Sequence, residues 1–258
     1  MPTLLLGLSG PSCSGKTTLA RLLRDALSPH AFILHEDDFY VTDALIPVKT
    51  MSDGRRLQDW DCLEAIDQAK LRMMLSYVKE SGKVREGFES KEDRNTVGNV
   101  RVNVEVVEAW KRIFGSLFKS EMQCGVRICI VDGFLLFSEE MKEVRDLFDL
   151  RLLLRADYEM VKRRREARSG YATLEGFWED PPGYVDEIVW PSYVRDHRFL
   201  FLDGNVEGEP DKSTIVKLGI DVAPKEVGYD MTKALEWAAE ILMKTLGRLD
   251  YKDERPYI

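Results

Sequence analysis

The chain has 258 residues, of which 44% are hydrophobic, which suits one α/β domain with a buried core and excludes a disordered protein. Its 37 Lys and Arg residues against 45 Asp and Glu residues give a net charge of −8, which disfavours general binding to nucleic acid or to anionic membranes. The four cysteines form no C-x-x-C pair and no zinc spacing, and no apolar run reaches the ~18 residues of a membrane span. We expect a cytoplasmic protein with free thiols, with the nucleus as an additional location.

Strands and helices alternate along the first half of the chain. Continuous apolar runs predict buried strands, and apolar residues three and four positions apart predict helices. The expected elements, in chain order, are a strand at 3–9, a helix at 15–29, a strand at 31–39, a helix at 61–82, a charged and aperiodic insertion at 83–103, a helix at 104–125 and a strand at 126–137.

The same alternation continues through the second half. The expected elements are a helix at 138–149, a strand at 150–156, a helix at 157–170, a loop at 170–183, a helix at 184–199 that Pro191 kinks or breaks, a strand near 213–222 inside a second insertion at 203–228, and a closing helix at 230–249 before a loose tail. This order of elements predicts a parallel sheet covered by helices on both faces. In such sheets ligands bind beyond the carboxyl ends of the strands.

Residues 10–17, GPSCSGKT, fit the G-x-x-x-x-G-K-S/T pattern of a phosphate-binding loop between a strand and a helix. The glycines let the backbone wrap around phosphate oxygens, and the helix N-terminus adds partial positive charge. Lys16 can reach the β- and γ-phosphates, and the Thr17 hydroxyl can ligate Mg²⁺. The sequence therefore predicts a site for a nucleotide phosphate.

Two further strand ends carry carboxylates. Asp37 and Asp38 follow the second strand, and their like charges repel unless a cation or substrate hydroxyls use them. Asp37 could accept a proton from a substrate hydroxyl and hold Mg²⁺ through water. Asp132 follows four apolar residues, the pattern of the carboxylate that supports Mg²⁺ in P-loop proteins. Capping of a helix or turn is the alternative at Asp38 and Asp132.

The segment KRRREAR, residues 162–168, is the densest positive cluster of this acidic chain. Arg164 and Arg168 share a helix face, whereas Arg165 points about 100° around the axis. The two faces suggest that some arginines point toward ATP and another toward the acceptor. The alternative is that the cluster is only a solvated face of the helix. Upstream, Trp60 and Asp61 offer an aromatic wall and a carboxylate for sugar hydroxyls, unless Asp61 caps the following helix.

Six motifs occur in the order found in nicotinamide riboside kinases, and the chain resembles that family of P-loop nucleoside kinases, which are related to uridine kinases. The motifs are GPSCSGKTTLA, DDFY, WDCLEA, DGFLLF, KRRREAR and PPGYVDEIVWPSY, and they span roughly residues 3–200. The resemblance implies phosphorylation of the ribose 5′-hydroxyl of nicotinamide riboside, and of nicotinic acid riboside, with ATP and Mg²⁺ in NAD biosynthesis.

The resemblance also implies a role for each motif. Thr17 would ligate Mg²⁺, and Asp37 would be both the catalytic base and a partner of Mg²⁺. The residues implied for ATP are Gly10, Pro11, Ser12, Cys13, Ser14, Gly15, Lys16, Thr17, Thr18, Arg164 and Arg168. Those implied for the riboside are Asp37, Asp38, Phe39, Tyr40, Trp60, Asp61 and Arg165.

The implied fold is the P-loop NTPase type of α/β fold, as a single domain over residues 1–258 with insertions near 83–103 and 203–228 and a lid near 163–183. A monomer is favoured. The chain departs from its relatives at Asp132, where they often have Glu, and at Trp60, where Tyr is common. Tyr171 is expected to be a second aromatic wall in the lid.

Two alternatives remain at this point. One is a uridine or cytidine kinase of the same fold, and the other is a P-loop switch that hydrolyses nucleotide to control a partner. A flat, cationic base suits Trp60 and Tyr171, whereas a pyrimidine needs hydrogen-bond partners at its edge that we do not locate. The chain contains no N/T-K-x-D guanine motif, which disfavours the switch.

Overall fold

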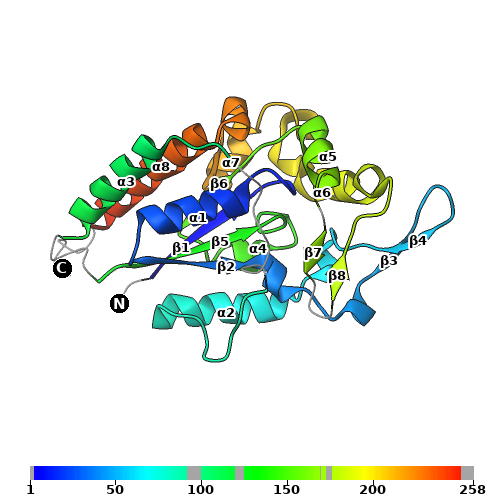
Figure 1. The fold of residues 1–258 in the computed structure, drawn as a ribbon, viewed down its shortest axis with the longest axis horizontal. Coiled ribbons are helices and arrows are strands. Elements are labelled where there is room, and N and C mark those ends of the chain that lie inside the picture. Colours follow the sequence, from blue (N-terminus) through cyan, green and yellow to red (C-terminus); the bar gives the residue numbers. More distant parts are fainter. Residues whose placement is uncertain (1–2, 92–99, 120–124, 169, 173–175, 251–258) are drawn as a thin grey trace.

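The computed structural model describes residues 3–91, 100–119, 125–168, 170–172 and 176–250. Its centre is a five-stranded sheet with the order β2-β5-β1-β6-β9 (Figure 1). The strands are β1 (Thr3–Ser9), β2 (Ala31–His35), β5 (Arg127–Gly133), β6 (Leu150–Leu153) and β9 (Ile220–Val222). All four neighbouring pairs run parallel, which confirms the predicted parallel sheet and places every carboxyl end at one edge.

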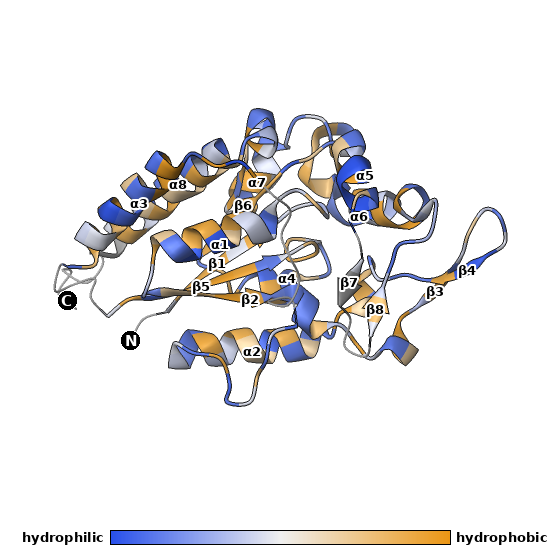
Figure 2. Ribbon diagram, viewed as in Figure 1, coloured by the Kyte–Doolittle hydropathy of each residue, from blue (hydrophilic) through white to orange (hydrophobic). Residues whose placement is uncertain are grey.

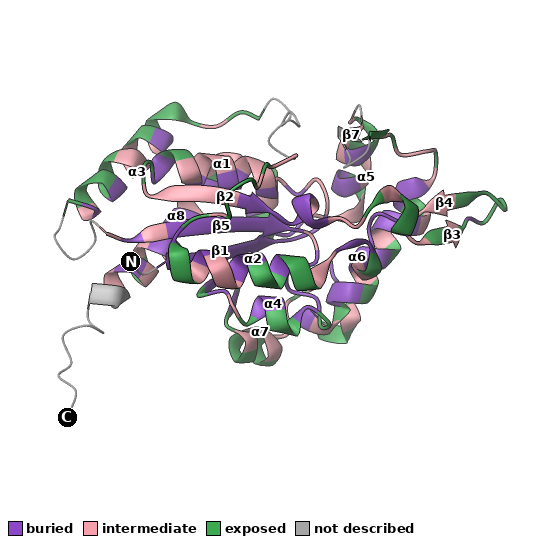
Figure 3. Cartoon of the chain, turned by 90° about the horizontal axis from the view of Figure 1, so that it is seen from below, coloured by how far each residue is buried: buried purple, intermediate pink, exposed green. Residues whose placement is uncertain are grey.

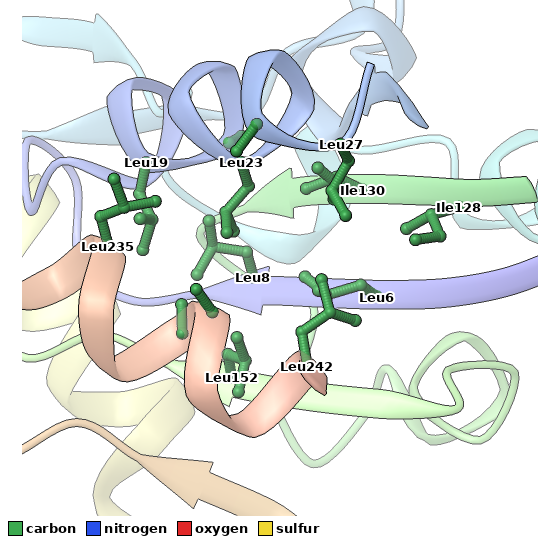
Figure 4. Close-up of a cluster of buried hydrophobic side chains, with 14 of the residues drawn as sticks. Leu6, Leu8, Leu19, Leu23, Leu27, Ile128, Ile130, Leu152, Leu235 and Leu242 are labelled. Carbon is green, nitrogen blue, oxygen red and sulfur yellow. The ribbon is translucent and has the colours of Figure 1, made fainter. Parts of the chain in front are cut away.

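Helices cover both faces of the sheet. One face packs against α1 (Lys16–Ala26), α3 (Val104–Leu117) and α8 (Met231–Asp250), and the other against α2 (Gln68–Ser81) and the short α4 (Lys142–Arg145). Side chains alternate between the two sides, so that Leu6 and Leu8 of β1 belong to the first core and Leu5 to the second. Figure 4 shows the first core, where leucines of α1 and α8 meet those of β1.

Because both faces are covered, the central strands are apolar in their middle residues. Figure 2 shows β1 and β5 in orange, while the helices carry one apolar and one polar side. Figure 3 shows the same strands buried and the outer side of α2 exposed. None of the helices in the described part of the chain is both long and apolar enough to cross a bilayer.

A second group of elements lies beyond the carboxyl ends of the strands (Figure 1). It contains the hairpin β3 (Val48–Thr50) and β4 (Arg56–Gln58), helix α5 (Tyr158–Glu166) and the short pair β7 (Tyr171–Ala172) and β8 (Phe177–Trp178). A π-helical turn at Val185–Val189 continues into α6 (Trp190–His197). These elements share a small apolar core around Trp60 and Tyr184.

The predicted strand near 213–222 is wrong in its first half. Residues Lys212–Leu218 form helix α7, and only Ile220–Val222 join the sheet, as β9. The Asp211 carboxylate accepts hydrogen bonds from the backbone N–H groups of Ser213 and Thr214, and Gly219 ends the helix with a φ of 60°. A side-chain cap and a C-terminal glycine therefore decide the local structure where the apolar pattern is ambiguous.

Other boundaries also differ from the sequence-based prediction. The helix expected at 138–149 shrinks to α4, and the helix expected from residue 61 begins at Gln68, where Asp67 caps it by accepting from Lys70 N at 2.9 Å. The strand expected to reach residue 39 ends at His35. Pro191 follows the π-helical turn Val185–Val189 and Trp190, so the chain is helical on both sides of the proline, as expected, and the proline does not break the helix. Parts of the predicted insertion at 83–103, of the helix at 104–125 and of the loop at 170–183 lie outside the described residues.

Candidate active site

The loop between β1 and α1 has the shape of a phosphate-binding loop. Gly10 has a φ of 149°, and a Cβ there would lie 2.6 Å from the carbonyl oxygen of Leu154, so only glycine fits. Gly15 has a φ of 98° and directly precedes α1. The first N–H groups of the helix are therefore turned toward the loop, the usual arrangement for binding an anion.

Lys16 is buried at the start of α1, and its Nζ donates to the carbonyl oxygen of Pro11 at 2.9 Å. Burial lowers the pKa of Lys16, and the carboxylates of Asp132 and Asp37 oppose that shift. The residues predicted from three separate strand ends therefore act on one another in the folded chain. A cationic side chain in this position can bond phosphate oxygens when a nucleotide binds.

Thr17 is bonded to the carboxylate at the end of β5. Its Oγ1 donates to Asp132 Oδ2 at 2.6 Å, and His35 Nδ1 lies 2.5 Å from the other carboxylate oxygen. Burial raises the pKa of Asp132, but His35, Thr17 and Lys16 together hold it below its usual value. Asp132 is thus an ionised acceptor beside the hydroxyl predicted to ligate Mg²⁺.

The DDFY segment follows β2 in a single 3₁₀ turn, Glu36–Phe39. Asp37 is half-buried at the sheet edge, whereas Asp38 is buried and accepts a hydrogen bond from Lys91 N at 2.6 Å. Phe39 is fully buried in the core and stacks on Phe88, so its side chain supports the segment instead of facing the pocket predicted for it. Burial raises the pKa of Tyr40 strongly, and the nearby charge of Asp37 adds to that rise.

Arg165 joins the phosphate loop to the predicted riboside side. Its Nη1 and Nη2 donate to Asp61 Oδ1 at 2.8 Å and Oδ2 at 3.0 Å, and Nη1 also lies 2.8 Å from Ser12 Oγ. Its Nε donates to Asp180 Oδ2 at 2.6 Å. Arg165 and Asp61 are each 6% exposed, so the pair is a buried and bidentate one.

Arg164 and Arg168 contact the residue of the phosphate loop that follows Ser12. Arg164 Nη1 donates to the carbonyl oxygen of Cys13 at 3.1 Å, and Arg168 Nη1 lies 3.8 Å from the Sγ of the same residue. Both guanidinium groups therefore border the phosphate loop, and the solvated-face alternative does not describe this cluster.

Comparison with known proteins agrees with this site. A family model described as "Phosphoribulokinase / Uridine kinase family" matches residues 5–169. The nicotinamide riboside kinase of Schizosaccharomyces pombe is 39% identical over 244 residues, which cover 95% of this chain and 98% of that protein. The nicotinamide riboside kinase of Saccharomyces cerevisiae is 35% identical and covers 93% of this chain and 96% of its own length. The corresponding kinase of Eremothecium gossypii is 35% identical over 80% of each chain.

The chain belongs to the nicotinamide riboside kinases. The membership confirms the resemblance inferred from the motifs, and it agrees with the P-loop α/β fold seen in the sheet order and the phosphate loop. The family uses ATP. In a nucleoside kinase of this fold, the acceptor is expected to bind beyond the carboxyl ends of the strands, where the second group of elements lies.

Three residues of this nicotinamide riboside kinase that sequence reasoning missed contact the residues predicted for the riboside. Trp178 and Asp180 come from the β7–β8 segment, where Trp178 Nε1 donates to Asp180 Oδ1 at 2.8 Å. Tyr184 donates its hydroxyl to the Gln58 carbonyl oxygen and accepts from Trp60 N, both at 2.9 Å. The aromatic and acidic residues of the segment GFWEDPPGY could have indicated such contacts, but its sequence pattern predicts only a loop.

Trp60 lies among aromatic rings. Its ring centroid is 5.3 Å from that of Tyr40 in an edge contact and 5.8 Å from that of Trp178, and its side chain is buried. Among the described residues, none accepts a hydrogen bond from Trp60 Nε1. Asp61 does not cap a helix, because α2 begins seven residues later. The side chain of Tyr171, predicted as the second wall, lies outside the described residues, and Trp178 of β8 is the aromatic residue that contacts Trp60.

Proposed function

We propose that this chain transfers the γ-phosphoryl group of ATP to the ribose 5′-hydroxyl of nicotinamide riboside, and also of nicotinic acid riboside, giving the mononucleotide for NAD biosynthesis. The observation that carries the proposal is the end-to-end similarity to a nicotinamide riboside kinase, at 39% identity over 95% of this chain. The geometry supports it, because a phosphate loop and a carboxylate- and aromatic-lined pocket meet at one sheet edge.

On the donor side, the loop from Gly10 to Thr18 would hold the ATP phosphates through its N–H groups and Lys16. Arg164 and Arg168 border the loop at Cys13 and would contact ATP. As the γ-phosphoryl group moves, negative charge builds up on its oxygens and on the leaving ADP. Lys16 and the arginines are positioned to stabilise that charge without reorganising.

On the acceptor side, Asp37 would accept the proton of the 5′-hydroxyl while its oxygen attacks the γ-phosphorus. The new O5′–P bond forms as the bond between the γ-phosphorus and the bridging oxygen breaks, and ADP leaves with the electron pair. Asp37 is half-buried, and its charge affects the pKa values of both Lys16 and Tyr40. A carboxylate in such a position suits a base that must reach a bound hydroxyl.

The donor set beside Lys16 fits Mg²⁺. Thr17 and Asp37 supply hard oxygen ligands, and Asp132 bonds the Thr17 hydroxyl. Among the described residues no three His, Cys, Asp or Glu side chains gather as a metal site, and Mg²⁺ in kinases takes one or two carboxylates plus substrate phosphates. Bound there, the ion would supply positive charge that offsets the negative charge of the transferred phosphoryl group.

The riboside would lie beside Trp60 and the lid. Asp61 and Arg165 would bind the cis-diol, and Trp60 would stack on the pyridine ring, with Tyr40 on one side and Trp178 on the other. Asp38 would contribute indirectly to riboside binding, through its hydrogen bond to the backbone N–H of Lys91. A pyridinium ring is attracted both to aromatic faces and to this acidic surround.

A coupled ADP-release assay tests the proposal. The substrates are nicotinamide riboside, nicotinic acid riboside, uridine and cytidine, each with ATP or GTP, and Lys16→Ala is the matched inactive control. We expect kcat/KM to be highest for the two pyridine ribosides with ATP. Equal or faster turnover of uridine would replace the proposal with the uridine kinase alternative, and turnover without any nucleoside would favour the switch.

Three further points belong to the proposal. The whole of residues 1–258 would act as one P-loop kinase domain with insertions near 83–103 and 203–228 and a lid near 163–183. It would work as a monomer in the cytoplasm, without nucleic acid or membrane partners. Light scattering of the purified protein and imaging of a tagged chain test the last two points directly.

A further inference from the structure

The ends of β2 and β5 are joined side chain to side chain. His35 and Asp132 are register partners in this parallel pair, so both side chains leave the sheet on the same face. His35 Nδ1 lies 2.5 Å from Asp132 Oδ1, and the two residues are 2% and 4% exposed. Because a carboxylate only accepts hydrogen bonds, the proton of this bond is carried by His35 Nδ1.

The second oxygen of the same carboxylate is also occupied. Asp132 Oδ2 accepts from Thr17 Oγ1 at 2.6 Å. The two bonds come from different elements, one from β2 and one from the first turn of α1, and together they restrict rotation of the carboxylate. Loss of either donor would leave Asp132 buried with one oxygen unsatisfied and the group free to turn.

Glu36, the first residue after β2, holds the backbone that follows Asp132. Glu36 Oε2 accepts from Phe134 N at 2.7 Å and from Leu135 N at 3.0 Å. Gly133 allows this approach, because a Cβ there would lie 2.5 Å from Glu36 Oε2. His35 and Glu36 therefore hold Asp132 and the turn that follows it.

We propose that His35 is a positioning residue, which fixes the Asp132 carboxylate against the Thr17 hydroxyl and so prepares the site for the nucleotide with its Mg²⁺. This positioning role depends on the proposed function in one respect, which is that the riboside is the phosphoryl acceptor. His35 does not touch the reacting atoms in this arrangement. Its effect passes through Asp132 and Thr17, as expected of a residue that orients a metal-site side chain.

The test compares three variants. His35→Phe keeps a flat ring of similar volume without a donor, and His35→Asn places an amide N–H close to the position of Nδ1. His30→Leu is the matched control, because His30 is a half-buried histidine bonded through Nδ1 to Val126 O at 3.3 Å, before the opposite end of β2. Calorimetry measures ADP affinity with and without Mg²⁺, and a steady-state assay gives kcat and KM for the riboside.

We expect His35→Phe to lower two quantities by about 10- to 100-fold, the Mg²⁺-dependent gain in ADP affinity and kcat. This is the usual effect of losing a residue that orients a metal-site side chain. KM for the riboside should change little, His35→Asn should recover most of both losses, and His30→Leu should match the wild type. If His35→Phe does not fold, His35→Leu provides the same comparison with His35→Asn.

A double-mutant cycle with Asp132→Asn completes the test. Once Asp132 has lost its charge, His35→Phe should have little further effect, since the two residues act as one unit. Fully additive losses, or a wild-type Mg²⁺ response in His35→Phe, would overturn the proposal, and so would equal impairment of His35→Phe and His35→Asn. A chain that phosphorylates no riboside but whose ADP binding follows the expected pattern would refute the proposed function and leave the positioning role standing.

Discussion

Arg165 and Asp61, 104 residues apart in the sequence, form a bidentate ion pair whose two hydrogen bonds measure 2.8 and 3.0 Å. The same guanidinium reaches Ser12 of the phosphate loop and Asp180 of the segment after β8. One side chain thereby connects the phosphate loop, Asp61 and the segment after β8. Its loss should be felt both in folding and in substrate binding.

Arg165→Met should lower the free energy of unfolding by about 3–5 kcal/mol, because it leaves Asp61 and Asp180 buried together without their cation. Urea denaturation measures the change. The double variant Arg165→Met, Asp61→Asn should regain part of the loss by removing one of the two carboxylate charges. An unchanged denaturation midpoint in Arg165→Met would show that the pair contributes nothing to the folded state.

Asp37→Asn should keep the fold and the affinity for ATP while kcat falls by about 10²–10⁴-fold, the usual contribution of a general base. Steady-state kinetics and calorimetry with ATP measure the two quantities, and melting temperature controls for folding. A fall in kcat of less than about tenfold would transfer the role of the base to another carboxylate, with Asp132 the first to test.

Lys16→Ala should abolish phosphoryl transfer to nicotinamide riboside and nicotinic acid riboside alike. The side chain lies in the phosphate loop and is bonded to Pro11 O, so it acts on ATP and not on the acceptor. Parallel assays with the two substrates measure this. A variant that lost one activity and kept the other would place Lys16 on the acceptor side.

Trp60→Ala should raise KM for nicotinamide riboside by about 5- to 150-fold with little change in KM for ATP, as expected for loss of a stacking contact worth roughly 1–3 kcal/mol. Trp60→Tyr should stay close to the wild type, since it keeps a flat ring. Because Trp60 is buried against Tyr40 and Trp178, melting temperatures of both variants are part of the measurement. Equal losses in both KM values together with a lower melting temperature would indicate a packing role alone.

Asp59 should make stability depend on pH. Burial, and then the neighbouring charge of Asp61, raise the pKa of Asp59 from 3.8 to about 6. Because the folded state holds the proton more tightly, the stabilisation is complete below about pH 4 and is lost as the pH rises through about 6. The wild type should therefore lose up to about 3 kcal/mol relative to Asp59→Asn over this range. Urea denaturation of both proteins at several pH values measures the difference, and parallel curves would contradict the raised pKa.

Much of the donor site could be predicted from sequence because its parts are local. The phosphate loop is a contiguous segment between a strand and a helix, and Asp37 and Asp132 each follow an apolar strand. The rule that carboxyl ends of parallel strands share an edge is enough to bring them near Lys16. The helical spacing of Arg164, Arg165 and Arg168 likewise predicts that they point in two directions.

The remaining features depend on contacts between distant segments, which no local pattern encodes. The register of β2 against β5 places His35 beside Asp132, and the path of the chain after β8 brings Trp178 and Asp180 to Trp60 and Arg165. Phe39 turned into the core because its 3₁₀ turn packs against the helix after it. The sequence by itself determined the fold class, the phosphate loop and the carboxylates of the sheet edge, since short-range pattern and strand direction suffice for them. Only the tertiary structure decided which side chains meet, because ion pairs and ring contacts form over a few ångströms between residues that the chain separates by a hundred.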